Sequence, residues 1–203
     1  YAETIKDITG DDKEKRSQQL DIIIAESDRL NNLVDDMLSL SRMQSGDIVI
    51  QPEAFDVAGL IQSILERYQL DKEAEDYELR YTGPQELKVM GDKRRIEQVI
   101  YNLLNNAINH IGKDNLVLIT VQPLKHKCKI TVEDHGDGIA AQHLPLIWER
   151  YYRVDKSGKR RKTGTGLGLS IVRSILISHK AQYGVNSTEG KGSSFWFELP
   201  IVK

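Results

Sequence analysis

The chain has 203 residues, of which 39% are hydrophobic and 29% charged, and its net charge at pH 7 is −2. This is the balance of a folded globular protein of one or two domains. The small net charge predicts no nucleic-acid partner, and the single cysteine, Cys128, excludes an intrachain disulfide and suits a reducing cytoplasm. No apolar run approaches the roughly 20 residues that span a bilayer. Because the sequence begins with Tyr1, we expect it to be part of a longer protein.

Residues 1–46 have the apolar periodicity of helices. Apolar residues recur at spacings of three, four and seven at Leu20, Ile23, Leu30, Val34 and Met37. A helical hairpin this short cannot bury such a stripe by itself, so we expect it to pack on a second copy and form a four-helix bundle. The alternative is an amphipathic helix that packs against its own domain. The run Gln44–Asp47 is the expected boundary with a second domain, residues 47–203.

The second domain mixes strand-like alternation with helical periodicity. We expect strands at 48–50, 77–82, 87–90, 116–121, 129–133, 183–187 and 193–199. We expect helices at 56–73, 92–111, 140–150 and 167–179, the first two capped by Asp56 and Asp92. Strands and helices do not alternate as βαβ units, which predicts an α+β fold with a helical layer on a mixed sheet.

The helix at 92–111 carries asparagines on one face. Asn102, Asn106 and Asn109 follow the spacing i, i+4, i+7 and therefore lie one above the other. Asparagine is a poor helix former, at a cost of up to about 0.7 kcal/mol relative to alanine, so a merely solvated face would more often use Lys and Glu. Amide oxygens in a row suit a hard cation such as Mg²⁺. A polar face with chance asparagines is the alternative.

Asp134 ends a predicted strand and is followed by Gly136 and Gly138. The alternation of the strand turns Asp134 inward with Cys128, Ile130 and Val132. An inward carboxylate beside two glycines predicts a pocket floor that accepts a hydrogen bond from a ligand amine. The same pattern, Asp-x-Gly-x-Gly, is also common in turns.

The run Gly164–Gly168 leads into the last predicted helix and predicts an anion site, because backbone N–H groups at a helix start bind phosphates. It is neither a Walker A loop nor a dinucleotide fingerprint, since Leu169 stands where a third glycine would be needed. The segment before it predicts a basic flap over the nucleotide, with a solvated charge run as the alternative. Its charged residues are Arg153, Asp155, Lys156, Lys159, Arg160, Arg161 and Lys162.

Together these motifs resemble the ATP-binding domain of the gyrase, histidine kinase and MutL superfamily, and within it a bacterial sensor histidine kinase. Arg95–Ala107 is similar to the N box of that family, Asp134–Gly138 to the G1 box, Ile147–Arg153 to the F box and Gly164–Gly168 to the G2 box. Ser27–Arg42 resembles the second helix of the dimerisation and phosphotransfer hairpin. The resemblance implies a two-layer α/β sandwich of the Bergerat type, with ATP and Mg²⁺ as cofactors.

The resemblance also implies roles for particular residues. Asp134 would read the adenine amino group, and Asn106 would ligate Mg²⁺ with support from Asn102. Arg153 would neutralise charge on the transferred phosphoryl group, so Asn102 and Arg153 are the candidate catalytic residues. The full set of implied nucleotide contacts is Asn102, Asn106, Asn109, His110, Asp134, Gly136, Gly138, Ile139, Tyr152, Arg153, Thr163, Gly164, Thr165, Gly166, Leu167 and Gly168.

The implied activity is transfer of the ATP γ-phosphate to a histidine, for relay to an aspartate of a response regulator. The implied partners are a second copy of the chain and a receiver domain, in the cytoplasmic part of a bacterial sensor anchored by upstream segments. The family's acceptor motif, His-Glu-x-Arg-Thr-Pro, matches none of the five histidines, so the alignment places the acceptor upstream of Tyr1 and this chain should not phosphorylate itself. Asn109 also departs from the family's usual Lys or Arg, and Lys180–Gln182 from a common Gly-Gly.

Two other functions compete with this one. ATPases of the gyrase and chaperone type carry a water-activating Glu four residues before the metal-binding Asn, where this chain has Asn102, which cannot act as a base. A non-catalytic docking module would have no need of Asp134, Asn106 and the glycines of the G2 box.

Overall fold

The computed structural model describes residues 14–17, 19–20, 22–24, 27, 50–69, 77–153 and 165–202. The chain divides into two compact units, Tyr1–Gly46 and Asp47–Lys203. Within the described ranges, none of the helices combines the length and the apolar character needed to cross a bilayer.

In the N-terminal unit, the described residues between 14 and 27 are helical, as predicted. The Ser27 hydroxyl donates to the carbonyl of Ile23 at 2.8 Å, a bond along the helix. Leu20 and Ile24, one turn apart, are 43% and 59% exposed. All other residues of the predicted hairpin at 1–46 lie outside the described residues.

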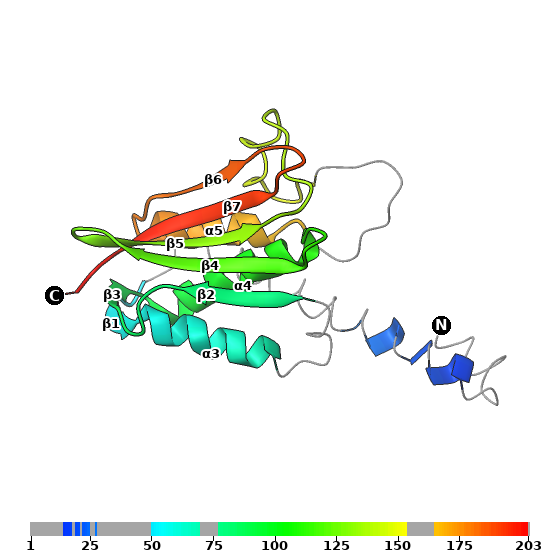
Figure 1. Cartoon of the computed structure of the whole chain (residues 1–203), viewed down its shortest axis with the longest axis horizontal. Coiled ribbons are helices and arrows are strands. Elements are labelled where there is room, and N and C mark those ends of the chain that lie inside the picture. The colour runs from blue at the N-terminus through cyan, green and yellow to red at the C-terminus, as the bar shows by residue number, and fades with distance from the viewer. Residues whose placement is uncertain are drawn as a thin grey trace. The chain divides into compact units, whose positions relative to one another are not determined.

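A five-stranded sheet forms the centre of the C-terminal unit (Figure 1). In spatial order its strands are β2 (Glu78–Thr82), β4 (Leu116–Pro123), β5 (Lys127–Asp134), β7 (Ser193–Pro200) and β6 (Tyr183–Ser187). The pair β2 and β4 is parallel and the other neighbours are antiparallel. The predicted mixed sheet is therefore confirmed.

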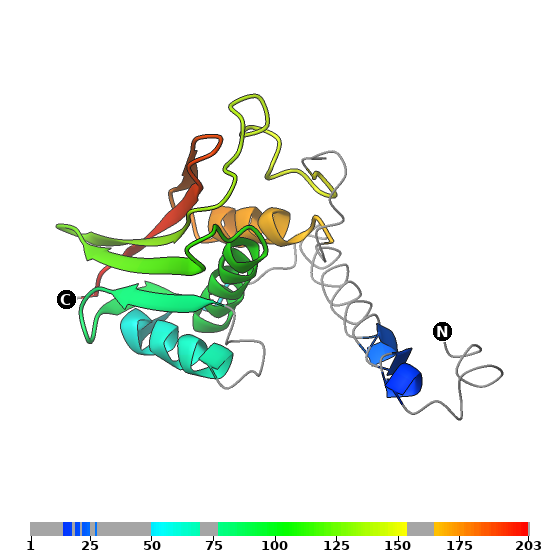
Figure 2. The same ribbon diagram turned by 45° about the vertical axis from the view of Figure 1, so that its right-hand side comes forward.

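Three helices cover one face of this sheet: α3 (Val57–Gln69), α4 (Lys93–Asn109) and α5 (Gly168–Ser178) (Figure 2). Two of them begin at the predicted caps, since the carboxylate of Asp56 accepts from the N–H groups of the first turn of α3 and Asp92 Oδ1 accepts from Arg95 N at 3.1 Å. The strand side chains that face the helices alternate along the chain and are at most 2% exposed: Val117, Ile119, Val121, Cys128, Ile130, Val132, Phe195, Phe197 and Leu199. This two-layer arrangement confirms the predicted α+β fold.

A further antiparallel pair, β1 (Glu53–Asp56) with β3 (Lys88–Gly91), lies outside the main sheet. Strand β1 was not predicted, because Phe55 is its one buried residue and no alternation is visible in four residues. Phe55 pairs with Val89 of β3, so the partner strand rather than the local pattern forms β1. The strand predicted at 48–50 lies outside the described residues except for Ile50, which has no regular structure.

The helix predicted at 140–150 is wrong. This segment forms successive turns, with bonds that mostly span three residues, such as His143 N to Ala140 O at 2.9 Å and Glu149 N to Leu146 O at 2.9 Å. Pro145 lies in its middle, where it lacks an N–H group and its ring would clash with the carbonyl four residues earlier.

Candidate nucleotide-binding site

Asp134 is the last residue of β5, and its side chain turns towards the helices, as the alternation predicted. It is 2% exposed, and its Oδ1 accepts a hydrogen bond from Gly136 N at 2.9 Å. Burial raises the pKa of Asp134 to about 6, while hydrogen bonds from the backbone at Gly136 and Ser193 partly oppose this rise. A buried carboxylate with a raised pKa is typical of a ligand-binding position.

The glycines that follow Asp134 lie where backbone segments nearly touch. A Cβ atom on Gly136 would be 1.7 Å from the carbonyl oxygen of His110, and one on Gly138 would be 2.1 Å from that of Thr188. Gly138 also has φ of 63°, a left-handed conformation that favours glycine. These contacts hold the end of α4, the turn after β5 and the β6–β7 turn together.

The asparagines of α4 share one face, with Asn102 and Asn106 half-buried and Asn109 exposed. Asn102 Nδ2 donates to Gln98 O at 3.0 Å, which leaves Oδ1 as an acceptor. A Cβ atom on Gly168 would lie 3.1 Å from this oxygen, so Asn102 meets the start of α5.

The C-terminal end of α4 meets the turn after Asp134, where Gly136 lies against the carbonyl of His110. At about 1.5 Å per residue, roughly 12 Å of helix separate this contact from the contact of Asn102 with α5. The asparagine row therefore lies between the turn after Asp134 and the start of α5, the two places where the sequence predicts ligand contacts. Asn105 lies away from that row, because its Oδ1 accepts from the Tyr68 hydroxyl of α3 at 2.7 Å.

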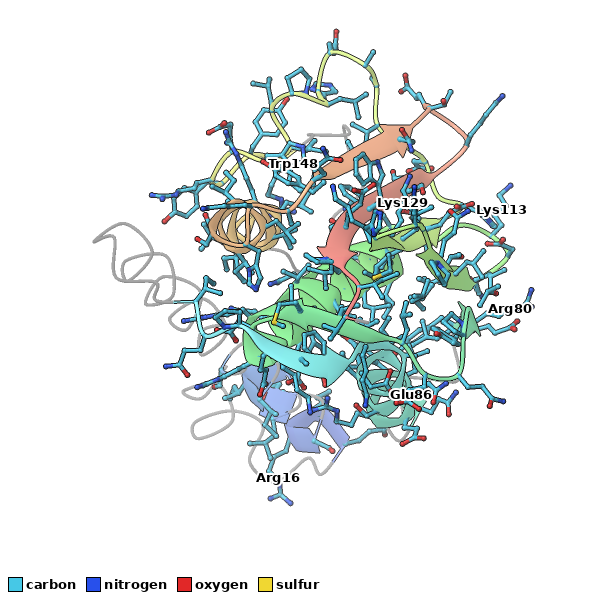
Figure 3. The ribbon with its side chains drawn as sticks, turned by 90° about the vertical axis from the view of Figure 1, so that its left-hand side faces the viewer. Arg16, Arg80, Glu86, Lys113, Lys129 and Trp148 are labelled. Atoms are coloured by element: carbon cyan, nitrogen blue, oxygen red, sulfur yellow. The ribbon has the colours of Figure 1, made fainter. Side chains whose placement is uncertain are left out.

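The F box and the G2 box meet through their backbones. Tyr151 N donates to Gly166 O at 2.9 Å, and a Cβ atom on Gly166 would be 2.9 Å from Tyr151 Cα. Both residues are left-handed, with φ of 60° at Tyr151 and 71° at Gly166. Trp148, which is labelled in Figure 3, anchors the F box. Its ring packs edge-on against Tyr183 of β6 and Phe195 of β7, with ring centroids 5.1 and 5.8 Å apart.

The start of α5 is where the sequence predicts an anion site. Thr165 Oγ1 accepts from Leu167 N at 3.2 Å, and Leu167 is fully buried. Leu167 is the N-cap residue and provides no side-chain cap for the helix that begins at Gly168. Backbone N–H groups in the first turn of a helix can serve as donors for an anion.

The remaining predicted contacts are only partly described. The hydroxyl of Tyr152, which is half-buried, lies 2.6 Å from His143 Nδ1, and Arg153 is exposed. Thr163 and Gly164 lie outside the described residues, as does the rest of the predicted basic flap.

Two serines near Asp134 were missed by the sequence analysis. Ser193, 6% exposed, pairs with Asp134 across β5 and β7. Ser187 Oγ accepts from Ile139 N at 2.8 Å, donates to Gly192 O at 2.8 Å and lies 3.1 Å from Ser193 Oγ.

A cavity of about 200 Å³ opens beside Asp134, Ser187 and Ser193. The sequence carries one signal for Ser193: it is a polar residue at the start of an inward-facing row that is otherwise apolar, with Phe195 and Phe197 next on the same face. Asp134 likewise stands at the end of an apolar row. Its meaning depends on the strand register, which the sequence does not show.

Comparison with known proteins identifies this arrangement. Residues 91–203 match the family described as histidine kinase-, DNA gyrase B- and HSP90-like ATPase, and residues 1–46 match the His Kinase A (phospho-acceptor) domain. The chain therefore belongs to the histidine kinase-, DNA gyrase B- and HSP90-like ATPase family, and among its members to the sensor histidine kinases. The predicted recognition and the ATP-binding character of the domain are confirmed.

Individual relatives agree with this placement. The chain is 32% identical over 177 residues to the sensor histidine kinase CusS of Escherichia coli O6:H1, covering 87% of this chain and 36% of CusS. It spans less than half the length of the curated relatives compared, at 36%, 47% and 34%.

Solved structures agree as well. Full-length ShkA in complex with AMPPNP has a TM-score of 0.77 at 24% identity, covering 93% of this chain and 39% of ShkA. Histidine kinase ThkA in complex with the response regulator protein TrrA has a TM-score of 0.73 at 25% identity, covering 95% of this chain and 53% of that one.

Proposed function

We propose that this chain is the ATP-binding catalytic region of a sensor histidine kinase, which transfers the γ-phosphate of MgATP to a histidine carried outside these residues. The observation that carries the proposal is the buried carboxylate of Asp134, 2% exposed, at the opposite end of the α4 asparagine row from the start of α5. A nucleotide that lies along α4 would place its base at Asp134 and its phosphates at the first turn of α5. ShkA, whose fold is similar, was solved with the ATP analogue AMPPNP.

Each polar group then has a role. The Asp134 carboxylate accepts a hydrogen bond from the adenine amino group, and Ser193 offers a second polar group at the base. Asn106 provides a Mg²⁺ ligand, with Asn102 supporting it through water. Arg153 neutralises charge on the γ-phosphate, since catalysis of phosphoryl transfer is mostly positioning and charge stabilisation.

The other proposed nucleotide contacts surround these groups. Asn109 and His110 lie at the C-terminal end of α4, on the side of the base and the sugar, and Tyr152 approaches from the F box. The backbone contacts are proposed at Gly136, Gly138 and Ile139 after β5 and at Thr163–Gly168 before α5.

We further propose that residues 1–46 form the dimerisation and phosphotransfer hairpin and residues 47–203 the catalytic domain. Leu20 and Ile24, which are 43% and 59% exposed, would be covered by a second copy of the hairpin. The partner that receives the phosphoryl group would be a receiver domain, as ThkA was solved with the response regulator protein TrrA. The parent protein would be a membrane-anchored bacterial sensor, with these residues in the cytoplasm.

The nucleotide site is tested by titrating the chain with a fluorescent ATP analogue, with and without Mg²⁺. Asp134→Asn replaces the hydrogen-bond acceptor by an amide and should abolish binding, while removal of Mg²⁺ should weaken it. The matched control is Glu86→Gln, which neutralises an exposed carboxylate in the turn before β3. Unchanged affinity in Asp134→Asn would refute the assigned site.

The reaction is tested with γ-labelled ATP. The chain alone should remain unlabelled, because residues 1–46 contain no histidine, but it should label a separately supplied hairpin with the family's acceptor motif. Free phosphate released without labelled protein would favour an ATPase. Nucleotide binding with neither product would favour a docking module, and label on one of the chain's own five histidines would overturn the proposal.

A further inference from the structure

His135 joins two carboxylates from different parts of the chain. Its Nδ1 lies 2.5 Å from Asp114 Oδ2, in the loop after α4, and its Nε2 lies 3.3 Å from Glu133 Oε1, on β5. We call these three residues the His135 cluster. Their side chains are 41%, 43% and 40% exposed for His135, Asp114 and Glu133, so the cluster lies at the surface and outside the proposed nucleotide contacts.

The cluster lies over a place where two backbone segments are in direct contact. A Cβ atom on Gly112 would be 2.1 Å from the carbonyl oxygen of His135, and one on Gly136 would be 1.7 Å from that of His110. The loop after α4 therefore lies directly on the turn that follows Asp134. A shift of either segment would move both the end of the asparagine row and the backbone that binds the Asp134 carboxylate.

Asp114 organises this loop as well as binding His135. Its Oδ1 accepts from Leu116 N at 3.4 Å, while Oδ2 faces the imidazole. Asn115 has a left-handed φ of 53°, its N–H donates to Gly112 O at 3.2 Å, and its carbonyl accepts from Glu78 N at 2.7 Å. Asp114 therefore contributes to the turn by which the loop enters β4, and the neighbouring Asn115 connects that turn to β2.

The charges around the imidazole favour its protonated form. Asp114 is the main cause of a raised pKa at His135, with Glu133 contributing, and His135 in turn lowers the pKa of Asp114. Asp134, the other acidic group that interacts electrostatically with His135, lies on the buried side of the same strand end. With both ring nitrogens protonated, His135 donates to Asp114 and to Glu133 at the same time.

We propose that His135 is a positioning residue of the nucleotide site: as an imidazolium bound to Asp114 and Glu133, it holds the loop after α4 against the turn that follows Asp134. The inference rests on the proposed function, since the geometry that the His135 cluster maintains is that of the proposed nucleotide site. Loss of the proton removes the positive charge and one of the two donors, so the loop is held less firmly and fewer molecules have a competent site. Nucleotide affinity would then fall as the pH rises through the pKa of His135.

The test compares His135→Gln and Asp114→Asn with wild type. The matched control is His126→Gln, a histidine in the exposed turn between β4 and β5. At pH 6.5, we expect both variants to bind the fluorescent ATP analogue about threefold more weakly, the scale of one partly exposed ion pair. The double variant should be weaker by less than the sum of the two single effects, because the two residues share one interaction.

Two further readouts separate positioning from a general loss of structure. The affinity ratio of wild type to His135→Gln should approach one as the pH is raised to 9, where His135 of the wild type is neutral and Asp134 is ionised in both proteins. Amide hydrogen exchange at residues 112–116 of the unliganded protein should be faster in both variants at pH 6.5, and no faster in the control.

Unchanged exchange and affinity in both variants would overturn the role of His135, as would a ratio that does not depend on pH. A wild-type chain that binds no nucleotide would instead refute the proposed function. The exchange measurement on the unliganded protein would then still decide whether the cluster holds the loop.

Discussion

Replacing Asp134 with Asn should stabilise the unliganded protein at neutral pH while it removes nucleotide binding. Burial raises the pKa of Asp134 from 3.8 to about 6, so the folded state resists ionisation of this carboxyl group. At about 1.4 kcal/mol per pKa unit, the two-unit difference makes the ionised carboxylate cost the folded state about 3 kcal/mol. Asparagine has the shape of the protonated acid, and its oxygen can still accept the hydrogen bond from Gly136.

The sign of the pH dependence follows from proton binding. Between pH 3.8 and about 6, the folded state holds the proton of Asp134 more tightly than the unfolded state does. This stabilising contribution is therefore fully present below pH 3.8 and is lost as the pH rises through about 6. Asp134→Asn has no such titration, so its advantage over wild type should be absent near pH 3.8 and largest above pH 6.

Urea unfolding at several pH values measures this difference, with the fluorescence of Trp148 and Trp196 as the signal from the C-terminal unit. We expect the gap in the free energy of unfolding to open between pH 4 and 6 and to reach at most about 3 kcal/mol. Glu86→Gln should show no such gap, since that carboxylate is exposed. Equal stability of Asp134→Asn and wild type at pH 7.5 would refute the reasoning from burial.

Two backbone substitutions test other parts of the site and fold. Gly166→Ala places a Cβ atom 2.9 Å from Tyr151 Cα at a φ of 71°, so we expect a loss of about 1–3 kcal/mol in unfolding free energy and weaker nucleotide binding. Lys180→Gly should have the opposite effect on stability, a gain of about 1 kcal/mol, because Lys180 follows the C-cap of α5 and has a left-handed φ of 53°. Urea unfolding and the nucleotide titration check both; unimpaired Gly166→Ala or unchanged Lys180→Gly would contradict these expectations.

Much of the helical layer could be predicted because its signals are local. Asp56 and Asp92 lie immediately before apolar-periodic runs, and each caps its helix through backbone N–H groups within three residues. Pro145 was an equally local signal against the helix predicted at 140–150, where apolar and polar residues alone suggested helical periodicity. Strand β1 is different, because it exists through its pairing with β3, more than 30 residues later.

The motifs of the nucleotide site could be found in the sequence, but their arrangement in space was predicted less completely. The inward direction of Asp134 could be predicted from the alternation along its own strand, and the 2% exposure of this residue agrees. Ser193 could not be placed beside Asp134, because that requires the register of β5 with β7. The close approaches at Gly136 and Gly138 are likewise contacts with His110 and Thr188, which are distant in sequence.

Residue type and spacing along the chain were sufficient for the capped helices and the asparagine row, because each depends on neighbours within a few residues. The order of the motifs and elements along the chain was sufficient for the family and the α+β class. The tertiary structure was needed for everything that depends on two segments meeting. It brings Asn102 to Gly168, Tyr151 to Gly166 and His135 to Asp114. The packing of α4 on the sheet beside α3 and α5 and the meeting of the F and G2 boxes set these contacts, and no local pattern carries that information.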